Sequence, residues 1–178
     1  MLGTLPKGWS IVCEDESIFV YDSIVRAVWA RRGSKPVVIK TGSHRKTCVF
    51  GALSMDGRQL FRQAREIDHL EFVRFLSALK RKFKKFLLFI DRAPWHGFGR
   101  RGAEEVKHYF AKNRKHITVV YFPKVSPELN PVEECWRQTK DSVLGSTFYP
   151  TFEEMKVALT RHLRTKRFDL DIVKYLCQ

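Results

Sequence analysis

Apolar residues in the first third of the chain alternate with polar ones and then form short continuous runs, a pattern typical of β-strands. Such stretches span 10–21, 28–32 and 46–54, and the last ends at an Asp-Gly turn. They predict an antiparallel set of three strands. The stretch 59–64 has a weaker strand pattern and is a candidate for a further short strand.

Helical spacing follows in the next part of the chain. Asp68 and Glu71 form a capping-box pattern ahead of apolar residues that recur every three or four positions from Phe72 to Phe83. This combination predicts a helix with one apolar stripe that packs on the sheet. Further helices are expected at 103–114, 131–144 and 152–164.

The continuous apolar run 86–90 is typical of a buried, central strand, and a further strand is expected at 117–122. Antiparallel strands followed by alternating helices and strands predict an α/β fold with a mixed sheet flanked by helices. The ribonuclease H-like order is one of several α/β folds that fit. We expect a single domain over residues 1–178, since this length can bury a core of its own.

Three acidic residues lie where these elements end or begin: Asp15 in the first strand, Asp91 directly after the run 86–90, and Glu133 in the first turn of a helix. If the fold brings them together, they form an oxygen-rich site for divalent cations. Asp91 is the strongest candidate, because a carboxylate after five apolar residues is partly buried and needs a partner. That partner is a metal, backbone donors or Arg92.

Simpler alternatives exist for the other two acidic residues. Asp15 points away from its two acidic neighbours in an extended strand, and it could be a solvated strand end. Glu133 could complete a capping box with Asn130, or form a surface pair with Arg137. The residues alone leave these alternatives open.

The net charge of +14 favours a polyanionic partner such as a nucleic acid, without choosing DNA over RNA. Arg31, Arg32, Arg137 and Lys140 are candidates to grip a phosphate backbone, and a loop residue, His96, could hold a phosphate or assist proton transfer.

The four cysteines form no Cys-x-x-Cys pair, so we expect reduced core thiols rather than a zinc site or disulfides. No stretch has the pattern of a signal peptide or a membrane span, so we expect no membrane partner and a cytoplasmic protein, associated with the nucleoid when bound to DNA.

At these residues the chain resembles the catalytic domain of DDE transposases of the mariner-like superfamily, in the branch carried by insertion sequences. The most specific block is Leu-Asn-Pro-Val-Glu at 129–133, with Trp136 and Lys140 after it. Four further segments match in family order: Asp15-Glu16-Ser17, 29–33, 50–53, and Ile90-Asp91 with Trp95-His96.

This resemblance implies a ribonuclease H-like fold and a requirement for Mg²⁺ or Mn²⁺, with two ions expected. It places the acidic triad on Asp15, Asp91 and Glu133 and excludes the neighbouring Glu134. Two features depart from the family pattern: the 41 residues between Asp91 and Glu133 are more than usual, and Arg92 stands where asparagine is common.

The resemblance also implies partners. They are double-stranded DNA, at the element ends and at the target. Family members carry helix-turn-helix modules before the catalytic domain, and we expect these to be absent here because Asp15 is so near the start. A homodimer and a separate end-binding chain are therefore both left open.

The function that follows is divalent-metal-dependent DNA strand cleavage and strand transfer. One alternative is a nuclease or resolvase on the same fold that cuts without joining. Another is a non-catalytic DNA-binding domain, such as a transposase fragment. The reaction products distinguish these cases: joined target strands indicate a transposase, cut strands alone a nuclease or resolvase, and no metal-dependent product a non-catalytic domain.

Overall fold

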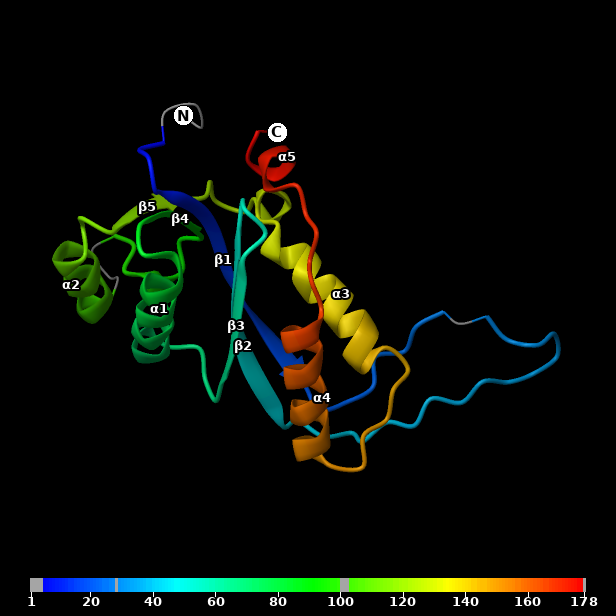
Figure 1. Cartoon of the computed structure of the whole chain (residues 1–178). Coiled ribbons are helices and arrows are strands. Elements are labelled where there is room, and N and C mark those ends of the chain that lie inside the picture. Colours follow the sequence, from blue (N-terminus) through cyan, green and yellow to red (C-terminus); the bar gives the residue numbers. More distant parts are fainter. Residues whose placement is uncertain (1–4, 28, 100–102, 178) are drawn as a thin grey trace.

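The computed structural model describes residues 5–27, 29–99 and 103–177, and it shows a five-stranded mixed sheet with helices on both faces (Figure 1). The strands, in the spatial order β3-β2-β1-β4-β5, are β1 (Ser10–Val20), β2 (Lys46–Ser54), β3 (Gln59–Ala64), β4 (Phe86–Ile90) and β5 (Ile117–Tyr121). The helices are α1 (His69–Phe83), α2 (Glu104–Lys112), α3 (Val132–Leu144), α4 (Phe152–Thr165) and α5 (Ile172–Leu176). Two 3₁₀ turns are η2 (Pro94–His96) and η3 (Pro127–Leu129).

The pairing of the strands is that of the ribonuclease H-like fold. β1 pairs with β2 and β2 with β3 in antiparallel fashion, whereas β1 pairs with β4 and β4 with β5 in parallel. The expected fold class, three antiparallel strands followed by parallel ones, is confirmed. Because β4 lies between β1 and β5, its continuous apolar sequence is explained by burial inside the sheet.

One predicted strand is wrong. In the segment 28–32, Val28 lies outside the described residues, and Trp29 to Arg32 do not form a strand. They belong to a long arm, described at residues 22–27 and 29–45, that extends away from the sheet between β1 and β2 (Figure 1). Trp29 on this arm is fully exposed, so its apolar side chain is not evidence that the segment lies in the sheet. The third antiparallel strand is β3, the stretch with the weaker pattern.

The alternation of β1 distributes its side chains between two cores. Cys13 and Phe19 pack on the side of α3 and α4, whereas Val12 packs on the side of α1 and α2. Figure 1 shows these two helical layers on opposite faces of the sheet. The odd-numbered Asp15 thus faces α3, and the even-numbered residues on either side of it face α1.

The local signals at helix starts and stripes are confirmed. The Asp68 side chain accepts a hydrogen bond from the N–H of Glu71 at 2.7 Å and caps α1. The stripe of α3 that faces the core is buried and consists of Val132, Trp136, Thr139 and Val143. Among the described helices, none is both long enough and apolar enough to span a bilayer.

The cysteines are all free, and three of them are buried. The expectation of core thiols is wrong for Cys177, which is exposed near the end of α5.

Candidate active site

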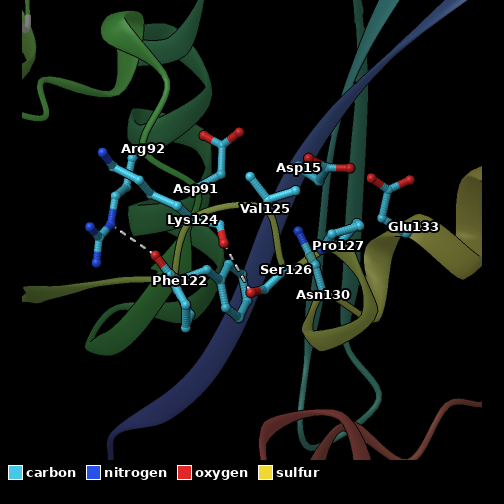
Figure 2. Close-up of a pocket in the computed structure, with 11 residues that line it drawn as sticks. Asp15, Asp91, Arg92, Phe122, Lys124, Val125, Ser126, Pro127, Asn130 and Glu133 are labelled. Atoms are coloured by element: carbon cyan, nitrogen blue, oxygen red, sulfur yellow. Dashed lines mark hydrogen bonds between the residues drawn. The ribbon is translucent and has the colours of Figure 1, made fainter.

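A cavity of about 370 Å³ opens where the carboxyl end of β4 meets β1 and the start of α3 (Figure 2). All three predicted acidic residues line it: Asp15, Asp91 and Glu133. The register explains the first two, because Cys13 pairs with Phe89 on the parallel strands β1 and β4. Asp15 and Asp91 each lie two residues beyond that pair and so sit at the same level of the sheet.

Asp91 has partners other than Arg92. Its Oδ1 accepts a hydrogen bond from the N–H of Ala93 at 2.8 Å and lies 2.7 Å from Nδ1 of His96. Although partial burial opposes it, these contacts with His96 lower the pKa of Asp91 and keep it ionised. The Arg92 side chain turns instead to the carbonyl oxygen of Phe122, at 3.0 Å, so the predicted Asp91–Arg92 pair is not the one that forms.

Asp15 is held from the opposite side by α3. Nε1 of Trp136 donates a hydrogen bond to Asp15 Oδ2 at 2.7 Å. Burial raises the pKa of Asp15 to about 8, and the nearby Glu133 carboxylate adds to this effect. Two carboxylates facing one another in a partly buried cavity disfavour a second negative charge, which a bound cation would relieve.

Neither simpler alternative for Glu133 is what the structure contains. The N–H of Asn130, which a capping-box glutamate would bind, donates to the carbonyl of Pro127. Arg137 forms its ion pairs with Glu134 and Asp141, at 2.6 and 3.0 Å. Glu133 is exposed in the first turn of α3 and lines the cavity (Figure 2).

Asn130 has a role in the site that its helix-capping pattern only partly indicates. Its side chain is buried, and Nδ2 donates to the carbonyl oxygen of Glu14 at 3.0 Å while Oδ1 accepts from the N–H of Val132 at 3.2 Å. Asn130 therefore ties the start of α3 to β1 next to Asp15. Sequence spacing indicates the helix start but not this contact, which joins residues far apart in the chain.

The candidate phosphate-binding residues are dispersed. Arg31 and Arg32 lie on the exposed arm between β1 and β2, and Arg137 is engaged with acidic neighbours. Lys140 lies on α3 with Nζ 5.7 Å from the centre of the Phe19 ring. The cations that line the cavity are Arg92 and Lys124, and neither was among the predicted DNA contacts.

His96 lies at the site but not at its surface. Its side chain is 1% exposed and its two ring nitrogens face Asp91 and Glu16. Burial alone would lower the pKa of His96, but the Glu16 carboxylate and the hydrogen bonds to Asp91 and Glu16 raise it well above its usual value. Direct contact with a DNA phosphate, which the sequence suggested, does not fit an imidazole enclosed in this way.

A ribonuclease H-like sheet with one acidic residue within the first strand, a second just after the adjacent parallel strand and a third at the start of a neighbouring helix defines the DDE class of phosphodiester-cleaving enzymes. The chain belongs to the DDE superfamily endonuclease family, whose sequence model matches residues 10–156. The family expected from the sequence motifs is thereby confirmed.

Solved structures agree with this fold. The Mos1 transposase in its paired-end complex with the left transposon end is similar with a TM-score of 0.65 and 17% identity, over 94% of this chain and 50% of that one. The catalytic core domain of BIV integrase is similar with a TM-score of 0.50 and 16% identity, over 90% and 86% of the two chains.

A curated relative, the uncharacterized protein y4pE/y4sA of Sinorhizobium fredii (strain NBRC 101917 / NGR234), is 29% identical over 69 residues. The match covers 39% of this chain and 44% of the relative. The chain thus spans about half the length of the Mos1 chain and matches less than half of the curated relative.

Proposed function

We propose that this chain is the catalytic domain of a DNA transposase that cuts a DNA strand and joins the freed end to target DNA. The observation that carries the proposal is the meeting of Asp15, Asp91 and Glu133 in one cavity of a chain that belongs to the DDE superfamily endonuclease family. Mos1 structures with transposon-end DNA add support from the fold.

The donor set fits Mg²⁺ or Mn²⁺, because three carboxylates offer the hard oxygen ligands that these ions prefer. Mos1 paired-end complexes have been solved with each of these metals. When bound, two such cations would supply positive charge that activates the attacking hydroxyl and stabilises the leaving oxygen.

The residues of the chain set the geometry for both steps. Asp91 is held by Ala93 and His96, and Asp15 by Trp136, so two of the three carboxylates are oriented before any ligand arrives. In the first step water breaks one phosphodiester and frees a 3′ hydroxyl. In the second that hydroxyl attacks a target phosphodiester, so that one bond forms for each bond broken.

A supercoiled plasmid incubated with the protein and Mn²⁺ tests the proposal. Nicked or linear plasmid together with joined target strands supports a transposase. Cut products without any joining, in the presence of a DNA fragment with a free 3′ hydroxyl, would favour the nuclease or resolvase alternative. Neither product from a folded protein that binds DNA would favour a non-catalytic domain.

Cation binding to the cavity is expected to stabilise the protein, and more so at higher pH. Since the pKa of Asp15 is about 8, its carboxyl holds a proton at neutral pH, which a bound cation must displace. The increase in Tm on adding Mn²⁺ should therefore grow from pH 6 to pH 8. An excess of one hundredfold over Kd stabilises by about 2.7 kcal/mol. An increase in Tm that is the same at both pH values would contradict this linkage.

DNA binding is expected to depend steeply on salt, because phosphate contacts release counterions. Arg92 and Lys124 line the cavity, so changing each to alanine should weaken binding and lower the salt slope by about one. Arg137→Ala is the matched control, since that guanidinium is already paired with Glu134 and Asp141 and should contribute less. Fluorescence anisotropy of a labelled duplex over a salt series measures both quantities, and equal slopes for all three variants would refute the assignment.

A further inference from the structure

A buried cluster of charged side chains lies behind the cavity, on the α1 side of β1. It consists of His96, Glu14 and Glu16, whose potential ligand atoms all lie within 4.8 Å of one another. The side chains of His96, Glu14 and Glu16 are 1%, 0% and 5% exposed. The catalytic scheme above uses neither glutamate, so burying two acidic groups here needs another explanation.

The imidazole of His96 bridges the two sides of this cluster. Nδ1 lies 2.7 Å from Asp91 Oδ1, and Nε2 lies 2.9 Å from Glu16 Oε1 and 3.8 Å from Glu14 Oε2. Carboxylate oxygens accept hydrogen bonds, so the ring nitrogen that faces Asp91 is a donor. The same Oε1 of Glu16 accepts a hydrogen bond from Nε1 of Trp95 at 3.0 Å.

Packing fixes the ring in this place. The centre of the Phe72 ring on α1 is 4.4 Å from that of His96, and the carbonyl oxygen of His96 accepts a hydrogen bond from the Tyr121 hydroxyl at 3.2 Å. The turn η2 brings His96 back toward Asp91, and Gly97 ends the turn with a left-handed φ of 75° that favours glycine. The donor is therefore set before any ligand binds.

The fixed position of His96 makes the two carboxylate oxygens of Asp91 differ in their contacts. Oδ1 accepts hydrogen bonds from both His96 Nδ1 and the N–H of Ala93, so it is committed within the protein. Oδ2 is the oxygen left for a cation. We propose that His96 is a positioning residue, which holds Asp91 so that it presents Oδ2 to the cavity, and that Glu16, which contacts Nε2, holds His96 from behind.

This arrangement links the two metal-binding strands through one side chain. Asp15 and Glu16 are consecutive on β1 and point to opposite faces of the sheet, Asp15 into the cavity and Glu16 toward His96. The chain of contacts Glu16–His96–Asp91 thus sets the position of Asp91 relative to the strand that carries Asp15. This inference rests on the proposed function, since it gives Asp91 the role of a cation ligand.

Two substitutions separate a donor role from simple packing. His96→Asn can keep an N–H near the position of Nδ1, whereas His96→Leu keeps an apolar side chain against Phe72 and has no donor. Loss of an outer hydrogen-bond partner of a metal ligand typically costs 10- to 100-fold in metal affinity. We expect His96→Leu to weaken Mn²⁺ binding by that factor in calorimetry, and His96→Asn to weaken it by less than about tenfold.

The two variants also define the results that would overturn the proposal. Wild-type Mn²⁺ affinity in a folded His96→Leu protein would remove the positioning role. Equal losses of Mn²⁺ affinity and of Tm in both variants would show that the ring acts only through packing. DNA affinity without metal is expected to stay at the wild-type value in both, which separates this effect from a damaged DNA surface.

A measurement without metal or DNA keeps this test independent of catalysis. In protein labelled with ¹⁵N-histidine, we expect a slowly exchanging Nδ1–H proton on one ring, assigned to His96 by its absence in His96→Asn. It should move or broaden in Asp91→Asn. If the chemical shift and line width of this proton are unchanged in Asp91→Asn, the proposed hydrogen bond between His96 and Asp91 is wrong, even if the protein cleaves DNA. If the resonance responds but no DNA product forms, the proposed function fails and the contact stands.

Discussion

Asp91→Asn is expected to abolish metal-dependent cleavage of DNA while the protein remains folded and still binds DNA. The amide keeps the shape of the side chain but loses the charge that a divalent cation requires at the end of β4. We expect a loss of at least roughly a hundred- to a thousandfold, the scale seen when one electrostatic stabiliser of a transition state is removed. The rate of plasmid nicking with Mn²⁺ measures it.

Matched variants make this prediction specific. Glu133→Gln should have the same effect, and Glu134→Gln is its control, because the neighbouring Glu134 is bound to Arg137 on the surface of α3. We expect Glu134→Gln to cleave at nearly the wild-type rate. Full activity of Asp91→Asn, or equal losses in both glutamate variants, would show that the acidic triad has been assigned to the wrong residues.

Gly51→Ala is expected to destabilise the protein and to damage the site at the same time. Gly51 pairs with Asp15 across β1 and β2, and a Cβ added to it would lie 2.4 Å from Cη2 of Trp136. The indole would have to move, and with it the Nε1–H that binds Asp15. Overpacking of this kind costs about 1–3 kcal/mol, or about 2–4 °C in Tm for each kcal/mol in a domain of this size.

A double variant tests this explanation. Trp136→Phe removes the part of the ring that the new methyl group would meet, so Gly51→Ala should cost less stability in that background than in the wild type. Cleavage should remain low, since phenylalanine has no donor for Asp15. Additive losses of stability would mean that Gly51 and Trp136 do not interact through space, and a wild-type Tm for Gly51→Ala would contradict the predicted clash directly.

Most of the fold follows from local signals that depend on few residues. The continuous run Phe86–Ile90 indicated a strand inside the sheet, and the pair Asp68 and Glu71 located the start of α1. The segment 28–32 was wrongly predicted to be a strand, because Trp29 is apolar yet exposed. Short-range patterns report what a side chain prefers, and they do not report whether a neighbouring strand is there to pair with it.

The candidate site also contains some residues that the sequence could predict and others that it could not. The three acidic residues could be selected from their positions at a strand or at a helix start, together with the family motif. The partners of Asp91, which are Ala93 and His96, are close to it in the chain. The contacts that tie β1 to the rest of the site could not be predicted, because they span long stretches of chain: Trp136 reaches Asp15 over 121 residues, Asn130 reaches Glu14 over 116, and His96 reaches Glu16 over 80. Such pairs are set by tertiary packing alone.

The register of β1 decides which of its three acidic side chains face the cavity. Asp15 lines the cavity on one face of the sheet, while Glu14 and Glu16 lie beside the buried His96 on the other. A slip of one position against β4 would exchange the two faces, and it would place both glutamates in the cavity and the aspartate behind it. Deleting a single residue early in β1 would thus remove Asp15 from the cavity, although all three acidic residues would still be present in the sequence.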